Sequence, residues 1–196
     1  MTGSVLAPYS QETGGSKARL AYRLFLRESF RTIRVTASVF PSSRFLTAAM
    51  LDHVDFRKPC TVAELGSGTG VMTREILRRM TPDSRLFALE INRNFVQHLR
   101  TSCQDKRLTV LHTDASDLLH HLRAHNTGAI HAVISSLGLT GMDAEQRARI
   151  VRQVEACLAP NGIMTQFQYL TPLTPVQGLP NRQIPWFQER QFLESY

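Results

Sequence analysis

Acidic and glycine residues at fixed spacing mark the part of this 196-residue chain that is best suited to bind a ligand. Residues 62–70 read Val-Ala-Glu-Leu-Gly-Ser-Gly-Thr-Gly, an acid followed by three glycines at alternate positions. Glycine permits a positive φ and leaves no Cβ in the way of a bound molecule. A strand that enters a helix through such a turn points backbone N–H groups at its ligand. We therefore expect this turn to bind a small molecule and not merely to join two elements.

Two more acidic residues follow at the ends of the next predicted strands. Glu90 comes 20 residues after Gly70 and ends the predicted strand 85–90. An acid at this place can accept hydrogen bonds from both ribose hydroxyls of an adenosine. Asp114 follows the next predicted strand, 108–112. The three features together predict a nucleoside site far more specifically than a glycine turn does alone.

The rest of the pattern predicts the elements that hold these residues. Apolar runs alternate with amphipathic segments, which indicates an α/β fold with a doubly wound, mostly parallel sheet of the Rossmann-like type. We expect Pro160, Asn161 and Gly162 to form a turn before the last strand. The expected strands are 61–63, 85–90, 108–112, 130–136 and 163–169, and the expected helices are 44–53, 71–80, 93–103, 115–125 and 143–158.

Local details of two helices also follow from the pattern. Ser42 or Ser43 is expected to cap helix 44–53. In helix 71–80, the residues predicted to face the core are Val71, Ile76, Leu77 and Met80. Four prolines after residue 170 leave only short segments, at 176–178 and 190–193, for the hairpin that usually closes such a sheet.

Composition divides the chain into a flexible tail at 1–16, a basic segment at 17–38 and a main domain at 39–196. The basic segment predicts an amphipathic helix, with Phe25 and Ile33 on one face and five arginines opposite. Such a helix can lie in the interface of an anionic membrane. It can equally dock on the domain core with a solvated charged face. The pattern alone does not choose between them.

The whole chain carries a net charge of +7, which favours an anionic partner. We find no apolar run that approaches the roughly 20 residues needed to span a bilayer, so no transmembrane segment is expected. Its three cysteines are scattered and lack metal-ligand spacing, which is typical of a reducing, cytoplasmic compartment. A metal at His120, His121 and His125 is not expected, because no acids or cysteines accompany them at ligand spacing. A structural role is likewise expected for His112.

The acid and glycine spacing at 64–70 resembles motif I of the class I S-adenosylmethionine (SAM)-dependent methyltransferases. Within that superfamily the chain resembles the bacterial phospholipid N-methyltransferases, which methylate phosphatidylethanolamine, and their ornithine-lipid relatives. The narrower resemblance depends on the basic first helix, on Phe40-Pro41-Ser42-Ser43 and on Gln166-Phe167-Gln168-Tyr169. It implies an enzyme on the inner face of the membrane that uses SAM, releases S-adenosylhomocysteine and takes an aminolipid as substrate, with no nucleic acid as partner.

The resemblance also implies residue roles. Glu64 and the glycine turn would hold the methionine part of SAM, Glu90 the ribose, and Asp114 with Ala115 the adenine. The predicted cofactor-binding residues are Ser42, Ser43, Glu64, Gly66, Ser67, Gly68, Gly70, Glu90, Ile91, Asp114, Ala115 and Ser135. The predicted catalytic residues are Ser135 and Leu137, which would line the methyl-transfer face, and Tyr169, a candidate proton acceptor. Two alternatives stay open: a soluble methyltransferase of a small amine or peptide, and a SAM-binding module without catalysis.

Overall fold

Five parallel strands form the centre of the computed structural model, which describes residues 42–139 and 142–167. Their order across the sheet is β3-β2-β1-β4-β5. This confirms the predicted doubly wound α/β fold. In chain order the elements are α2 (Ser42–Leu51), β1 (Thr61–Leu65), α3 (Val71–Arg79), β2 (Arg85–Glu90), α4 (Arg93–Ser102), β3 (Leu108–His112), the 3-10 turn η1 (Ala115–Asp117), α5 (Leu118–Ala124), β4 (Ile130–Ser135), α6 (Ala144–Cys157) and β5 (Leu158–Gln166).

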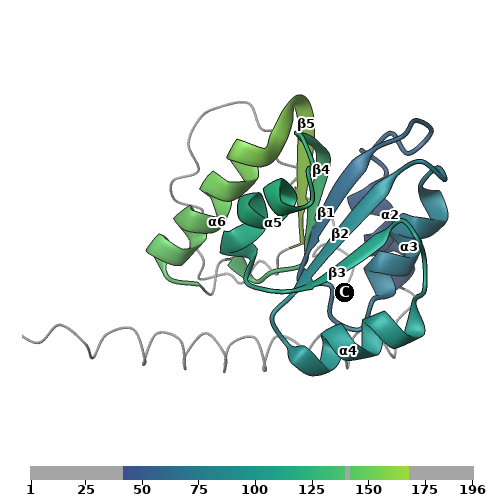
Figure 1. Cartoon of the computed structure of the whole chain (residues 1–196), viewed down its shortest axis with the longest axis horizontal. Coiled ribbons are helices and arrows are strands. Elements are labelled where there is room, and N and C mark those ends of the chain that lie inside the picture. Colours follow the sequence, from purple (N-terminus) through teal and green to yellow (C-terminus); the bar gives the residue numbers. More distant parts are fainter. Residues whose placement is uncertain (1–41, 140–141, 168–196) are drawn as a thin grey trace, which may run out of the picture. The chain divides into compact units, whose positions relative to one another are not determined.

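Helices cover both faces of the sheet. Figure 1 shows α2 and α3 on one face, with α5 and α6 on the other. After β1 the chain adds β2 and β3 on one side, and it then crosses back to place β4 on the other side of β1. The order of the strands therefore reverses at β1, and ligands of such folds bind beside this point, at the carboxyl ends of the strands.

The central strands are buried on both faces, as expected of a parallel sheet with two helical layers. Every residue of β2 except Arg85 is buried, and four of the five residues of β1 are buried. On the α2 and α3 face, Leu51 and Ile76 pack with Val62, Leu86 and Ile134 in one apolar cluster. On the other face, the ring of Phe87 lies 5.5 Å from that of His125 at the end of α5.

Most element bounds agree with the sequence prediction to within one or two residues. Both strands 85–90 and 108–112 are confirmed as predicted. The predicted helix 115–125 is divided into η1 and α5 because Asp114 caps a short turn, its Oδ1 accepting from the Ser116 N–H at 2.8 Å. Helix α2 already begins at Ser42, so the two serines lie inside the helix, and the prediction that one of them precedes and caps it was wrong.

One residue of α3 was assigned to the wrong environment. Val71 is 52% exposed, whereas Thr73 is fully buried. Positions 73, 76, 77 and 80 follow the i, i+3, i+4, i+7 spacing of a single helix face, and all four are buried. Val71 lies outside that spacing, in the first turn after the glycines, where it is open to the carboxyl edge of the sheet.

The prediction that Pro160, Asn161 and Gly162 form a turn before the last strand was wrong in its position, because the chain turns inside that strand. These residues lie within β5, which pairs with β4 at both ends. Leu158 pairs with Ile130 and Ile163 pairs with Ala132, so residues 159–162 face the single residue His131. The extra residues form a bulge. A bulge and a turn use the same residue types, and only the pairing on either side distinguishes them.

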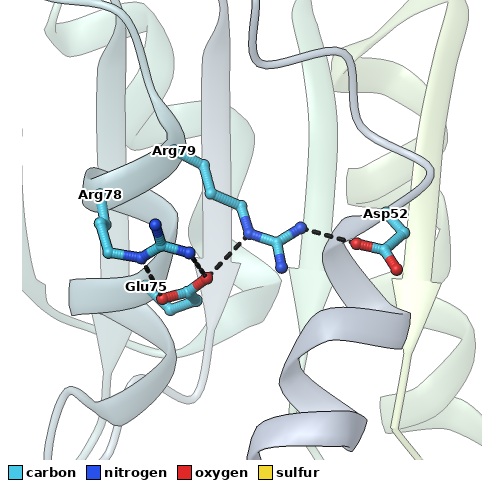
Figure 2. A network of polar contacts seen from close by, with 4 residues as sticks. All are labelled: Asp52, Glu75, Arg78 and Arg79. Atoms are coloured by element: carbon cyan, nitrogen blue, oxygen red, sulfur yellow. Dashed lines mark hydrogen bonds and ion pairs between the residues drawn. The ribbon is translucent and has the colours of Figure 1, made fainter.

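Charged side chains fasten the end of α2 to the end of α3 (Figure 2). Arg79 on α3 donates from Nη1 to Asp52 Oδ1 and from Nε to Glu75 Oε1, each at 2.8 Å. Arg78 adds two further bonds to Glu75. Hydrogen bonds from Arg78 and then Arg79 lower the pKa of Glu75 to about 2. The network joins the end of α2 to α3.

Several predictions fall on residues that the structure does not describe. These are the tail 1–16, the basic segment 17–38, the hairpin segments 176–178 and 190–193, and Tyr169. Across the described ranges 42–139 and 142–167, none of the helices has the length and apolarity needed to cross a bilayer. All three cysteines are free thiols.

The geometry of Gly70 gives a prediction on stability. Its φ is +82°, and a Cβ there would clash with the fully buried side chain of Leu99. We expect Gly70→Ala to lower the free energy of unfolding by about 2–4 kcal/mol, from the left-handed backbone and the overpacking together. Urea denaturation measures the change. Gly128→Ala is the matched control, because a Cβ at Gly128 has no neighbour within 4 Å. Equal stability of the two variants would contradict the assignment.

Candidate functional site

The glycine turn after β1 is held in a conformation that only glycine adopts easily. Gly66, Gly68 and Gly70 have φ of 80°, 52° and 82°. The turn is fastened to the neighbouring strand, since the N–H groups of Gly66 and Ser67 both donate to the Leu89 carbonyl, at 2.9 and 3.2 Å. A Cβ on Gly66 would lie 2.9 Å from Leu137 Cδ2. The turn therefore lies against the segment that follows β4.

Glu90 is the acid that orders this turn. Its side chain is almost fully buried. Oε2 accepts from the Gly68 N–H at 2.8 Å, and Oε1 accepts from the Asn92 N–H at 2.7 Å. Burial raises the pKa of the carboxyl, although the backbone donors oppose the rise. Each oxygen keeps a second lone pair, so the same carboxylate can bind two ligand hydroxyls while it holds the turn.

Glu64 is fully buried one residue before the end of β1. Thr73 Oγ1 of α3 donates to its Oε2 at 2.6 Å, while its Oε1 has no hydrogen-bond partner. Burial is the main cause that raises its pKa to about 7, and the charge of Glu90 adds to it. A cationic donor at Oε1 would compensate this desolvation. Glu64 Oε1 is thus a buried acceptor that lacks a hydrogen-bond donor.

Unpaired polar atoms gather at one edge of the sheet. Within residues 42–139 and 142–167, the buried side-chain atoms without a hydrogen-bond partner are Glu64 Oε1, Ser67 Oγ, Thr165 Oγ1 and Gln166 Oε1. All four belong to the carboxyl ends of β1 and β5 or to the turn after β1. Leaving such an atom unpaired costs about 1–3 kcal/mol. Four of them on the ligand-binding edge indicate a polar ligand there.

Ile91, Asp114 and Ala115 lie at the carboxyl ends of β2 and β3. Ile91 is 37% exposed and, with Val71, is one of two large apolar residues exposed among those described. Its carbonyl is 3.1 Å from His112 Nε2, which gives that histidine the structural role expected of it. Ala115 is buried and Asp114 caps η1. An exposed apolar side chain beside a capping acid can receive a flat base with an exocyclic amine.

Ser135 and Leu137 lie where β4 ends, beside the glycine turn. Ser135 is fully buried and pairs with Leu65 at the end of β1. Its carbonyl accepts from the Phe167 N–H at 2.9 Å. The Leu137 carbonyl accepts from Gln166 Nε2 at 2.6 Å. Both carbonyls thus bind protein donors, and the role of Ser135 and Leu137 in lining the methyl-transfer face stays a prediction.

The structure leaves other predicted positions less defined. Ser42 and Ser43 begin α2, and their side chains lie outside the described part of the chain, as does Tyr169. Among the described residues, no group of three or more His, Cys, Asp or Glu could hold a metal ion. His121 instead bonds Thr113 Oγ1 at 2.9 Å.

Sequence reasoning missed three residues of the site: Thr73, which holds Glu64, Asn92, which bonds Glu90, and Gln166. A signal for Thr73 was available, because a lone polar residue occupies the apolar face of its helix. Asn92 could have been found as the cap of α4, whose side chain accepts from the Asn94 N–H. Gln166 had no local signal, since its importance comes from the neighbouring strand.

The residues present fit SAM. Its ammonium would meet the unpaired oxygen of Glu64, its ribose hydroxyls the carboxylate of Glu90, and its adenine the surface of Ile91 beside Asp114. This fit depends on unpaired buried acceptors and on a glycine turn with no room for a Cβ, and not on the resemblance of the sequence.

Comparison with known proteins also indicates a methyltransferase. Residues 62–162 match the family model described as a methyltransferase domain. An ornithine lipid N-methyltransferase of Singulisphaera acidiphila is 31% identical over 144 residues, which cover 73% of this chain and 75% of that protein.

Two solved structures share the fold at lower identity. The 1,6-didemethyltoxoflavin-N1-methyltransferase of Burkholderia thailandensis, solved with its substrate and S-adenosylhomocysteine, has a TM-score of 0.55 and is 16% identical, over 82% of this chain and 65% of its own. This chain thus spans just under two thirds of that structure. The cyclopropane synthase MmaA2 of Mycobacterium tuberculosis has a TM-score of 0.50 and is 15% identical, over 60% of this chain and 39% of its own.

The buried position of Glu64 predicts a pH dependence of stability. Its pKa is about 7 in the folded protein and near 4.5 when exposed. Between these values the folded state keeps a proton that the unfolded state releases, so stability falls as the pH rises from about 4.5 through 7. We expect Glu64→Gln, which cannot ionise, to lose this dependence, worth up to about 3 kcal/mol.

Urea denaturation at several pH values between 4.5 and 8 measures the effect. The matched control is Glu145→Gln on α6, whose carboxylate is exposed and lies 3.8 Å from Arg149. This control should keep the wild-type profile. Parallel profiles for wild type and Glu64→Gln would show that Glu64 is already ionised at low pH.

Proposed function

The chain belongs to the methyltransferase domain family, as a class I SAM-dependent methyltransferase, and on that premise we propose that it methylates the amine of a lipid headgroup. The proposal of a lipid substrate is supported by the 31% identity to an ornithine lipid N-methyltransferase over three quarters of that protein. The observation that supports transfer chemistry is the set of unpaired acceptors at the carboxyl edge of β1 and β5. Neither depends on the other.

SAM supplies a methyl group on a sulfonium, which is electrophilic without further activation. The chain then needs to hold the donor, orient the amine and exclude water. Glu64 and Glu90 bind the donor from β1 and β2, with the turn fixed between them. The buried end of β4, at Ser135 and Leu137, closes the site from the other side.

The acceptor must present a neutral amine in order to attack. The nitrogen attacks the methyl group with its lone pair, which a protonated amine does not have free. The rate should therefore rise with pH through the pKa of the bound ammonium. Tyr169, three residues beyond Gln166 at the end of β5, is our proposed proton acceptor. Its place in the sequence puts it near the carboxyl end of a strand, where such folds bind ligands.

Two headgroups fit the proposal. The resemblance of the sequence favours phosphatidylethanolamine, whereas the relative from Singulisphaera acidiphila favours ornithine lipid. Both carry a primary amine beside an acidic group. We propose that the basic segment 17–38 recruits the protein to the anionic surface where either lipid resides, each arginine contributing about 1 kcal/mol. Catalysis then needs no transfer of the lipid into water.

Replacement of Glu90 tests the cofactor placement. We expect Glu90→Ala to weaken the binding of S-adenosylhomocysteine by about 1–3 kcal/mol, because the ribose hydroxyls lose their acceptor and the turn loses its anchor. Isothermal titration calorimetry measures the affinity. Glu75→Ala, in the network at the far end of α3, is the control and should bind as the wild type does. Unchanged affinity in Glu90→Ala would remove the ribose site from this place.

Lipid methylation tests the substrate. We expect purified protein with labelled SAM, in mixed micelles, to transfer label to phosphatidylethanolamine or ornithine lipid, and thin-layer chromatography of the products separates the two. Free ethanolamine and free ornithine are the matched soluble acceptors and should react far more slowly. Faster labelling of these soluble amines would favour the alternative, a methyltransferase of small amines, and no labelling of any amine would favour a binding module.

A further inference from the structure

Gln166 is the last residue of β5 and lies beside the end of β4. It pairs with Ser135, and the next residue, Phe167, donates its N–H to the Ser135 carbonyl. The side chain crosses to the loop after β4, where Nε2 donates to the Leu137 carbonyl at 2.6 Å. Leu137 in turn lies next to Gly66, since a Cβ on Gly66 would lie 2.9 Å from Leu137 Cδ2. These contacts connect Gln166 to the glycine turn through a single intermediate residue.

The orientation of this amide is fixed by its partners. Nε2 bonds two carbonyls, those of Leu137 and Phe167. A carbonyl accepts and never donates, so the nitrogen must face both of them. The other amide atom, Oε1, is therefore fixed as well. It is buried and has no hydrogen-bond partner among the described residues. Gln166 thus presents one immobile acceptor at the carboxyl edge of β4 and β5.

Of the three other unpaired buried atoms, Thr165 Oγ1 belongs to the residue before Gln166 on β5, and the other two lie at the cofactor turn. Glu64 and Ser67 belong to β1 and its turn, where the cofactor is held. Gln166 lies at the paired ends of β4 and β5 and not at the turn after β1, and we assign these strand ends to the acceptor side of the proposed reaction. An uncharged acceptor there suits an N–H donor, and an amide oxygen is too weak a base to remove the proton that the amine needs to lose.

We propose that Gln166 Oε1 accepts a hydrogen bond from the substrate amine and thereby selects headgroups that still carry an N–H. The inference rests on the proposed aminolipid function and names a specificity-determining residue for it. A primary or partly methylated amine can donate to Gln166, whereas a quaternary ammonium has no hydrogen to donate. Gln166 therefore favours the substrates over the fully methylated product and helps to release that product.

Binding measurements test the proposal without turnover. The probes are short-chain phosphatidylethanolamine, ornithine lipid and the N-trimethyl form of each, titrated calorimetrically into protein saturated with S-adenosylhomocysteine at pH 7. For the lipid that binds, we expect the wild type to prefer the primary amine over its trimethyl form roughly tenfold or more, the usual strength of a hydrogen bond to a charged group. We expect Gln166→Met to lose that preference while keeping its affinity for S-adenosylhomocysteine.

The comparison of two ligands with two proteins separates the hydrogen bond from headgroup size, because size acts equally on both proteins. The matched control is Gln153→Met on α6, which removes the acceptor of the Leu119 N–H at 3.1 Å. It should lower stability and leave the preference unchanged. A preference equally strong in Gln166→Met would show that the residue only fastens the loop after β4, and would overturn the inference.

Two further outcomes are also decisive. If Gln166→Met does not fold, the wild type alone decides, since a wild type without the preference contradicts an acceptor for N–H. If the wild type binds none of the four lipids, the proposed function fails, and this inference fails with it. Binding of a lipid without the preference overturns only the role of Gln166, so the two failures are distinguishable.

Discussion

The rest of the site depends on the hydrogen bonds that the buried carboxylate of Glu90 accepts from two loops. It holds the Gly68 N–H from β1's turn and the Asn92 N–H from the start of α4, so one side chain fixes two loops at the switch point of the sheet. Burial makes each of these bonds strong and makes the loss of any one costly. Glu90 adds to the bonds from the Gly66 and Ser67 N–H groups to the Leu89 carbonyl, and together these bonds restrict a glycine backbone that would otherwise adopt many conformations.

Several buried polar atoms at the carboxyl edge of the sheet have no hydrogen-bond partner, which is typical of a ligand-binding site. Glu64 and Gln166 each have one oxygen bound to no protein donor, although both oxygens are buried. A fold selected for stability alone would pair or expose them. Here both acceptors stay unpaired, so a ligand that donates to them would recover free energy that folding left unused.

The helices on the two faces of the sheet differ in what they contribute to the site. On one face, α3 carries both the glycine turn and Thr73, the partner of Glu64, and ion pairs at its other end fasten it to α2. On the other face, α5 and α6 supply apolar contacts to the core. The ligand-binding side chains come from the strand ends and their loops, which the helices hold in place. This division explains why Val71 is exposed while Thr73, Ile76, Leu77 and Met80, on the opposite side of the helix, are buried.

The sequence by itself determined the local features of this protein: the glycine turn, the acid at position 90 and the alternation of strands and helices. These follow from residue types within one segment, and strands 85–90 and 108–112 were predictable to the residue. Only the tertiary structure decided the bulge at 159–162, the exposure of Val71 and the role of Gln166. Each of these depends on a partner from a distant segment, because pairing register and burial are properties of two elements together and cannot be read from either one alone.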